Sequence, residues 1–384
     1  MLHNKNSNDT SQNIALVHSG EDYFSRLESI IMNSQFEIHL QIYLFENDAT
    51  GKRIINALKE AASRQVKIYL ILDGLGSISF PSEISNELKR CGINFRFFAP
   101  LFSAYTFYLG RRLHQKIVVA DRRVALIGGI NIADKYHGTA EDAPWLDYAV
   151  QLNGEIVKPI QELCYAIFFQ KRRLQSQKIK AVFHLQEDTL VRIIRNDWLK
   201  SKREISTAYI KSIGNAKEEI TIVGSYFLPG RKIIQALKKA AKNKVRIKLI
   251  LTGKSDLPIT RRATCYLYSM LLSYNIELYE WNNSILHGKV AVVDKYWTTI
   301  GSFNLNNLSS YGSIEANVEI NSTLFSAMYQ AHLNQIIAQC KQITPETLVI
   351  KNTAMTKFTN WISYYSTKII EIIVTFTPYR RFYN

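Results

Sequence analysis

The chain has 384 residues, of which 47% are hydrophobic and 21% charged, the composition of a globular protein long enough for two domains. Its formal net charge of +16 favours a polyanionic partner, either nucleic acid or an anionic lipid surface. No stretch approaches the roughly 20 apolar residues that span a bilayer, so a membrane role is expected to be peripheral. The four cysteines, Cys91, Cys164, Cys265 and Cys340, are too widely spaced for a metal or redox motif, as in a reduced cytosolic protein.

The first elements along the chain are a polar tail and the beginning of an internal repeat. Residues 1–13 lack the apolar core of a secretory signal and are predicted to form a flexible tail. Residues 51–74 align without gaps with residues 230–253. In both segments apolar residues recur at helical spacing and a continuous apolar run follows, which predicts an amphipathic helix leading into a buried strand.

The same order of elements surrounds both copies of the repeat. A strand candidate precedes each helix, at 37–45 and at 218–227, and a helix, a short strand and a strand with a polar motif follow. Further strand candidates at 147–153 and 315–321 close each copy. Alternating strands and helices predict an α/β fold of two duplicated domains related by pseudo-two-fold symmetry, each a mainly β sheet with helices on both faces.

The repeat also sets the expected domain boundaries. We place the domains at 14–172 and 203–345, a helical connector rich in Lys, Arg and Gln at 173–202, and a C-terminal tail at 346–384. Because one chain carries both copies, an oligomer is not required to complete a site between them.

The polar motif occurs once in each copy, in LHQKIVVADRRVALIGGIN (113–131) and in LHGKVAVVDKYWTTIGSFN (286–304). Both read His-x-Lys-x4-Asp and then, at the same spacing, Gly-Gly-x-Asn or Gly-Ser-x-Asn. The six motif residues form the candidate catalytic set: His114, Lys116, Asp121, His287, Lys289 and Asp294. Side chains two apart in a strand share a face, so each His points with its Lys. Each Asp falls at the strand end and is expected to hold the turn rather than touch substrate.

A single copy of this motif would be better explained as a buried strand with a satisfied histidine, but two copies inside a repeat favour a function. Together they supply two imidazoles, two ammonium groups and the carboxamides of Asn131 and Asn304. This set suits a phosphate diester, because the lysines and asparagines can donate to its non-bridging oxygens and stabilise the transition state.

The expected mechanism has two steps and uses no metal and no other cofactor. One histidine attacks phosphorus to form a phosphohistidine, while the other protonates the departing alcohol and then deprotonates the incoming one. A nucleophilic imidazole must present one nitrogen and have a partner on the other. Asp147 and Glu315 begin matching strands after the asparagines and are expected to orient the histidines.

These motifs resemble the paired motifs of the phospholipase D superfamily, and WLDYAVQLNG with GSFNLNNLSSYGSIEANVEI resembles bacterial cardiolipin synthases. The resemblance covers residues 14–345. It implies nucleophile and acid/base roles for the two histidines, phosphate binding by the two lysines and two asparagines, and orientation by Asp147 and Glu315. The lack of N-terminal transmembrane helices likens the chain to the shorter, peripheral members. NLNNLSS stands where family members often have NLDxRS, which leaves the acceptor alcohol open.

Two apolar segments bear on the choice between lipid and nucleic acid. The stretch PLFSAYTFYLGRRLH at 100–114 places aromatic residues and two arginines beside the predicted pocket, as suits entry of an anionic lipid; a buried helix or loop is the alternative. The tail after residue 350 has one apolar helical face, including Phe358, Trp361 and Ile369, with Lys357 and Glu371 mostly opposite. That face is expected either to attach to a membrane or to pack on the second domain.

The combined prediction is a cardiolipin synthase-like phosphatidyltransferase, peripheral on the cytoplasmic side of the cell inner membrane. It would join two phosphatidylglycerols into cardiolipin and glycerol, with an anionic phospholipid substrate and the membrane surface as partners. A phospholipase D that hydrolyses phosphatidyl lipids is one alternative. A metal-independent nuclease of the same superfamily is another, so nucleic acid stays open as a partner.

Overall fold

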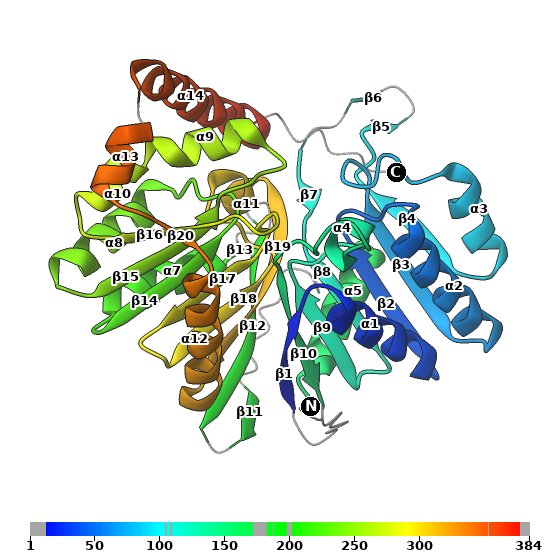
Figure 1. Ribbon diagram of the computed structural model, residues 1–384. Helices are drawn as coiled ribbons and strands as arrows, with labels where there is room; N and C mark the ends of the chain where they lie inside the picture. The colour runs from blue at the N-terminus through cyan, green and yellow to red at the C-terminus, as the bar shows by residue number, and fades with distance from the viewer. Residues whose placement is uncertain are drawn as a thin grey trace.

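The computed structural model of the protein describes residues 13–103, 106–107, 110–171, 183–186, 188–197, 202–351 and 353–376. Two sheets stand next to each other at the centre of the molecule, with helices outside them (Figure 1). Each sheet contains one copy of the internal repeat, so the architecture follows the duplication in the sequence.

The first sheet has the strand order β1-β10-β9-β8-β2-β3-β4. Its strands are β1 (Ile14–His18), β2 (Glu37–Ile42), β3 (Lys67–Asp73), β4 (Asn94–Phe98), β8 (Lys116–Ala120), β9 (Val124–Gly128) and β10 (Tyr148–Asn153). Strands β2, β3 and β4 are parallel, and the remaining pairs are antiparallel. The helices of this half are α1 (Glu21–Asn33), α2 (Ala49–Ser63), α3 (Ser82–Arg90), α4 (Asp134–His137) and α5 (Val157–Phe168).

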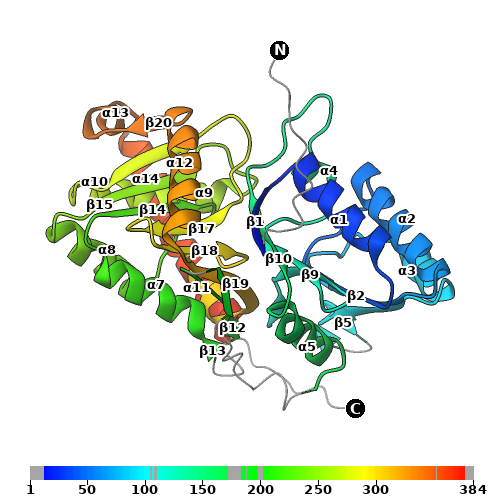
Figure 2. The same ribbon diagram turned by 90° about the horizontal axis from the view of Figure 1, so that it is seen from below.

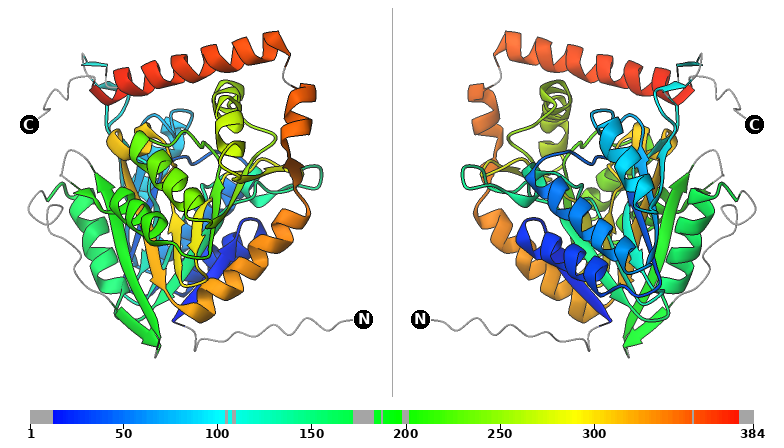
Figure 3. Two further views of the ribbon diagram at one scale, coloured as in Figure 1. Left: turned by 90° about the vertical axis from the view of Figure 1, so that its left-hand side faces the viewer. Right: turned by 90° about the vertical axis from the view of Figure 1, so that its right-hand side faces the viewer.

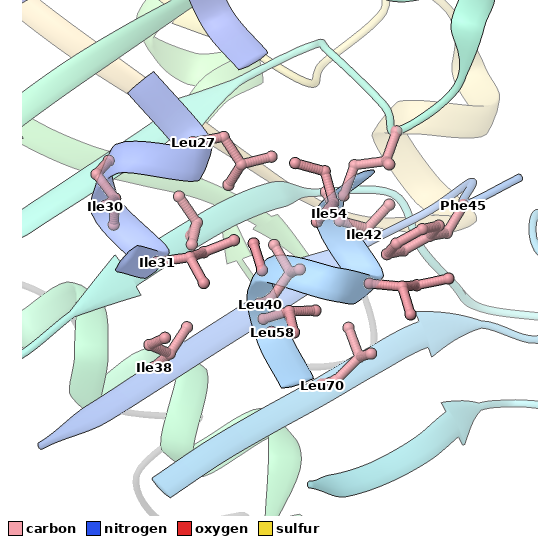
Figure 4. Packing of buried hydrophobic residues seen from close by; sticks show 14 of the residues in the cluster. Leu27, Ile30, Ile31, Ile38, Leu40, Ile42, Phe45, Ile54, Leu58 and Leu70 are labelled. Atoms are coloured by element: carbon pink, nitrogen blue, oxygen red, sulfur yellow. The ribbon is translucent and has the colours of Figure 1, made fainter. Parts of the chain in front are cut away.

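The repeat helix α2 shows how the sequence specifies this half. The Asp48 side chain caps the helix by accepting a hydrogen bond from the Gly51 N–H at 2.8 Å. Ile54 and Leu58 recur one turn apart and point to the sheet, where they share a buried cluster with Leu40 of β2 (Figure 4). Helices α1 and α2 therefore cover the outer face of the first sheet.

The second sheet has the order β11-β12-β19-β18-β17-β14-β15-β16-β20, with β13 paired to β12. Its strands are β11 (Phe183–Gln186), β12 (Thr189–Asp197), β13 (Lys202–Arg203), β14 (Glu219–Gly224), β15 (Arg246–Thr252), β16 (Glu277–Trp281), β17 (Lys289–Val293), β18 (Trp297–Gly301), β19 (Ser313–Asn321) and β20 (Lys341–Ile343). Its helices are α7 (Glu204–Asn215), α8 (Arg231–Lys242), α9 (Pro258–Tyr266), α10 (Tyr268–Leu272), α11 (Asn307–Tyr311), α12 (Thr323–Ala338), α13 (Pro345–Lys351) and α14 (Ala354–Phe376).

The inner faces of the two sheets meet in one apolar core. Ile117 and Ile127 of the first sheet lie in the same buried cluster as Val290 and Val318 of the second. Helices α5 and α12 cover other parts of these inner faces (Figure 2). The motif strands β8 and β17 are buried along their whole length, which explains their unbroken apolar runs. The predicted fold class, two duplicated α/β units with helices on both faces of each sheet, is confirmed.

The segment before the first motif joins the two halves. Strands β5 (Phe102–Ser103) and β6 (Thr106–Phe107) form an antiparallel hairpin, and β7 (Arg112–Leu113) then pairs in parallel with β19 of the other half. Most side chains of the apolar stretch 100–114 lie outside the described residues, so its predicted part in lipid entry stays a prediction.

The helical connector predicted at 173–202 is wrong for the residues that the structure describes there. Strands β11 and β12 occupy much of this segment, and β12 pairs antiparallel with β19. Buried Val191 and Ile193 alternate with exposed Arg192, the two-residue period of a strand, and the many basic residues obscured it. Residues 172–182, 187 and 198–201 lie outside the described part, as does the predicted N-terminal tail apart from Asn13.

Candidate active site

The two motif histidines are fixed to the backbone of the opposite half. The His114 N–H donates to the carbonyl of Ile314 at 3.0 Å, and the His287 N–H donates to the carbonyl of Leu146 at 2.8 Å. A bridge between Leu146 and Leu286 supports the second contact. Both motifs therefore meet at the contact between the halves, as the duplication predicts.

The ring of His114 is held by a carboxylate of the second half. Its Nδ1 lies 3.0 Å from both carboxylate oxygens of Glu315, which is fully buried on β19. The hydroxyl of Ser302 donates to the same carboxylate. Burial lowers the pKa of His114 below its ordinary value, although Glu315 acts in the opposite direction. The imidazole is therefore neutral near pH 7, with its Nδ1–H on Glu315 and a free lone pair on Nε2.

The ring of His287 is held in the same way by the first half. Its Nδ1 lies 2.6 Å from Oδ2 of Asp147, at the start of β10. Burial raises the pKa of Asp147 to about 7, against the opposing effect of Lys289 and of the Tyr148 N–H. Burial, together with the neighbouring Lys289, lowers the pKa of His287 well below its ordinary value.

Both motif lysines are buried beside these rings. The Lys116 ammonium donates to the carbonyl of His114 at 2.6 Å, and that of Lys289 donates to the carbonyl of His287. Burial lowers the pKa of Lys116 to about 7 and that of Lys289 to about 8. Glu315 and Asp147 raise both lysine pKa values, so the lysines and carboxylates of the two halves act on each other within one electrostatic cluster.

The two asparagines lie in this cluster with their carboxamides fixed. Oδ1 of Asn131 accepts from the Leu44 N–H at 3.1 Å, and its Nδ2 donates to the Tyr136 hydroxyl at 2.9 Å. Oδ1 of Asn304 accepts from the Ser225 hydroxyl at 3.0 Å. In each half the carboxamide oxygen is held by the turn that follows β2 or β14. Each amide nitrogen carries two N–H groups, and Asn131 uses one of them for Tyr136.

The motif aspartates belong to the turns at the far ends of β8 and β17 and not with the catalytic set. Asp121 accepts hydrogen bonds from the backbone N–H groups of residues 35, 36 and 37, and Asp294 accepts from those of residues 217, 218 and 219. Five residues of strand, about 17 Å, separate each aspartate from its lysine. This geometry agrees with the expectation that the two aspartates hold the turns, and it does not agree with their place in the candidate catalytic set.

Comparisons with known proteins agree with this arrangement. A sequence model of the family described as "Cardiolipin synthase, PLD-like domain" matches residues 27–163 and 209–337. Cardiolipin synthase B of Escherichia coli strain K12 is 36% identical over 353 residues, which cover 88% of this chain and 84% of that protein. The chain belongs to the phospholipase D-like cardiolipin synthase family.

Two further proteins are similar to this chain, one in sequence and one in fold. Minor cardiolipin synthase ClsB of Bacillus subtilis is 28% identical over 336 residues, covering 87% of this chain and 83% of that protein. The crystal structure of phosphatidylserine synthase from Haemophilus influenzae Rd KW20 superposes with a TM-score of 0.75 over 94% of this chain and 95% of that chain. Because the two sequences are only 13% identical, this likeness concerns the fold alone.

Three tyrosines around the histidines of this family member escaped the sequence analysis. The Tyr43 ring lies 4.9 Å from the His114 ring, between centroids, and the Tyr226 ring lies 6.0 Å from that of His287. The Tyr136 hydroxyl is 3.5 Å from Nε2 of His287. Tyr43 and Tyr226 follow the equivalent strands β2 and β14, but the strand register places Tyr43 opposite Ser225 of the second copy, so an alignment of the copies does not pair the two tyrosines.

A buried ion pair that sequence analysis also missed holds the first motif in place. Asp73, at the end of β3, accepts from the Leu113 N–H at 2.7 Å and lies 3.4 Å from the Arg112 guanidinium. Both residues of β7 are thereby tied to the first sheet while β7 pairs with the second. In the second copy Thr252 stands at the position of Asp73, so this tie is specific to His114.

No group of three or more His, Cys, Asp or Glu side chains placed to hold a metal ion is found among the residues described. Each histidine has a carboxylate on Nδ1 and each carboxylate is engaged by its histidine.

Proposed function

We propose that this protein is a phosphatidyltransferase that joins two phosphatidylglycerols into cardiolipin and glycerol through a phosphohistidine. Four side chains would carry the reaction, two histidines as nucleophile and acid/base and two lysines as phosphate ligands, with Asn131 and Asn304 as further donors. Asp147 and Glu315 would be positioning residues for the rings. The naming of its relatives as cardiolipin synthases supports the choice of lipid product.

The observation that carries the proposal is the reciprocal clamping of the two imidazoles. Each Nδ1 is bound to a buried carboxylate of the other half, at 3.0 Å for His114 and 2.6 Å for His287. With Nδ1 engaged, Nε2 is the ring nitrogen of each histidine left to react, as a nucleophile and an acid/base pair acting on one phosphorus would require.

In the first step one Nε2 would attack the phosphorus of phosphatidylglycerol. The other histidine, which takes up a proton when the anionic phosphate enters beside it and raises its pKa, gives that proton to the departing glycerol oxygen. The P–O bond to glycerol breaks as the P–N bond forms. In the second step the now neutral histidine takes a proton from a hydroxyl of the second phosphatidylglycerol, whose oxygen displaces the first histidine. The ammonium groups of Lys116 and Lys289 would neutralise the equatorial oxygens in both steps.

Burial of the site supports transfer to an alcohol over hydrolysis. The side chains of His114 and His287 are only 15% and 6% exposed. If little water reaches the phosphohistidine, hydrolysis competes weakly with attack by the hydroxyl of a bound lipid.

The lipid substrates place the enzyme at a membrane surface, and we propose the cytoplasmic face of the inner membrane. None of the helices in the described parts of the chain has the length and hydropathy needed to cross a bilayer. The excess positive charge supports contact with anionic headgroups.

The test is incubation of the purified protein with phosphatidylglycerol vesicles in the presence of a chelator, followed by lipid mass spectrometry. Cardiolipin and glycerol in equal amounts from the wild type, and neither from His114→Ala, are expected. Phosphatidic acid in place of cardiolipin would make the protein a hydrolase. No lipid product, together with metal-independent cleavage of DNA, would support the nuclease alternative.

A further inference from the structure

Helix α14 has its polar face inward and its apolar face outward. Asn360, Ser363 and Glu371 follow each other along one side of the helix and are buried against the protein, with exposed fractions of 5–7%. The exposed side carries large apolar residues: Met355, Phe358, Trp361, Tyr365, Ile369 and Ile373. The alternative that this apolar face packs on the second half is therefore wrong. A helix on an aqueous surface has the opposite orientation.

Specific contacts fix the rotation of α14 about its axis. It packs along α9, where the rings of Tyr364 and Tyr266 lie 4.7 Å apart between centroids. The Lys368 ammonium donates to the carbonyl of Leu228 at 3.0 Å and to Glu371 at 3.2 Å. Glu371 in turn is hydrogen-bonded to Asn307. Turning the apolar face inward would break these polar contacts, so the outward orientation is built into the fold.

The same contacts link α14 to the active site. Asn307 begins α11, three residues after Asn304 of the second motif, and the Leu228 N–H is bonded to the carbonyl of Leu305 in the same turn. In Figure 3 the red helix α14 lies across one end of the molecule, and the cyan hairpin of β5 and β6 lies on that side too. The apolar face and the chain leading into His114 thus share one side of the molecule.

The charges around this face select its occupant. The sequences of α9 and α14 contain one acidic residue, Glu371, and its side chain is buried. Lys357 of α14 and Arg262 of α9 are exposed. Within α9 and α14 the apolar face thus has basic and no exposed acidic neighbours, while the exposed Asp256 and Glu346 lie in the segments before these helices. This distribution of charge is complementary to an anionic bilayer surface.

We propose that α14 docks flat on an anionic bilayer, with its outward apolar face in the headgroup and acyl boundary, and brings the active site to the membrane. This inference rests on the proposed function in one respect, namely that the bilayer is the one that holds the lipid substrate. The docking surface is defined by the six exposed residues named above.

The test uses the full chain and measures binding apart from turnover, by flotation with vesicles of equal parts phosphatidylglycerol and phosphatidylcholine. The double variant Ile369→Glu/Ile373→Glu is expected to reduce the bound fraction by about tenfold or more, because two apolar side chains leave the boundary and two negative charges enter the surface. Leu324→Glu is the control. This residue is 75% exposed in the first turn of α12, a helix that lies away from α14 (Figure 1), so its substitution should leave flotation unchanged.

A second measurement reports where the helix lies. Trp361 is 47% exposed on the docking face, so brominated phosphatidylglycerol in the vesicles should quench part of the tryptophan fluorescence, and Trp361→Phe should abolish that part. Equal flotation of wild type and double variant, with no quenching assigned to Trp361, would overturn the proposal. So would a dimer, measured by light scattering without lipid, that the double variant dissociates.

These outcomes are separate from those of the proposed function. A wild type that floats and is quenched but makes no cardiolipin supports docking and contradicts the transferase. A wild type that makes cardiolipin while the double variant floats normally supports the transferase and contradicts docking. Circular dichroism of each variant establishes that the fold is retained.

Discussion

The two carboxylates that bind His114 and His287 belong to side chains of different length, and different residues surround them. Glu315 is accompanied by the hydroxyl of Ser302, whereas the shorter Asp147 lies against a glycine. A Cβ at Gly129 would come within 2.4 Å of Oδ1 of Asp147, so no side chain fits there. The two copies thus keep the same clamp on Nδ1 with different residues around it.

The charge of Glu315 is expected to matter as well as its shape. In Glu315→Gln the amide can still contact Nδ1 of His114, but the imidazolium that forms during proton transfer loses its counter-charge. We expect kcat to fall by about two orders of magnitude or more. Since Glu315 raises the pKa of His114, the acid limb of the pH–rate profile should move to lower pH. Ser302→Ala, which removes a donor to the carboxylate and keeps its charge, should cost much less; equal losses would contradict this role.

The buried lysines set the expected alkaline limit of activity. The pKa of Lys116 is lowered to about 7 and that of Lys289 to about 8, because burial removes water from the ammonium groups. The protonated form binds phosphate, so kcat/KM should decline as pH rises through about 7 to 8 and beyond, by about tenfold per pH unit for each essential lysine. Rates on phosphatidylglycerol in micelles across this range check the prediction. A rate that keeps rising above about pH 9 would rule it out.

At the scale of elements, the motif strands β8 and β17 carry a site residue at one end and a turn-stabilising residue at the other. The lysine begins each strand inside the site, and the aspartate follows its last residue and binds three backbone N–H groups. The spacing between lysine and aspartate is the same in both copies because it is the length of one strand. It is not the distance between two catalytic groups.

Asp121→Ala should consequently reduce stability more than activity. It removes three hydrogen bonds to a carboxylate and leaves alanine at a φ of 53°, a conformation that alanine rarely adopts. We expect a loss of about 2 kcal/mol in the free energy of unfolding, measured in urea, with kcat per folded molecule little changed. Asp294→Ala is the matched change in the other copy. A large fall in kcat with normal stability would return Asp121 to the catalytic group.

The sequence predicted those helices and strands whose formation depends on the local pattern of apolar and polar residues. The repeat at 51–74 and 230–253, the motif strands and the amphipathic α14 follow from spacing alone, and the structure has them. The strand β12 was missed because Arg192 and Arg195 interrupt its apolar residues. The direction in which α14 turns its apolar face depends on the Lys368 and Glu371 contacts with other elements, which helical spacing does not contain.

At the scale of the whole molecule, a polar and aromatic cluster lies between the halves behind Asp147. The Tyr148 hydroxyl of β10 is 3.1 Å from Nε2 of His332 on α12, and the His18 ring packs 4.6 Å from that of His332, between centroids. Burial and the neighbouring His18 lower the pKa of His332 to about 4. A protonated His332 is therefore disfavoured in the folded protein.

This shift predicts an acid-sensitive contact between the halves. Between about pH 4 and the ordinary histidine pKa of 6.5, the unfolded chain binds a proton that the folded chain does not. The contribution of His332 is therefore fully present above pH 6.5 and is lost as pH falls toward 4. Thermal unfolding of the wild type should weaken over this window more steeply than that of His332→Gln, which carries no titrating ring. Parallel pH dependences would exclude this residue as the cause.

The composition of the site was predictable from sequence, but its crossed pairing was not. The four His and Lys residues, both asparagines and both orienting carboxylates could be named from the motifs. Which carboxylate serves which histidine depends on how the halves face each other, and so does the contact of Tyr136 with His287. The contact of Arg112 with Asp73 lies within the first half, between residues 39 positions apart. These are relations between segments far apart in the chain, and no local spacing specifies them.

The crossed clamps have a consequence for inheritance. Because His114 depends on Glu315 and His287 on Asp147, neither copy of the duplicated gene segment is free to drift after duplication. Substitutions in one half change the fitness of residues in the other, so these positions should vary together across lineages. Loss of one half leaves no enzyme rather than half an enzyme, and two separately expressed halves would regain activity only by reassembling.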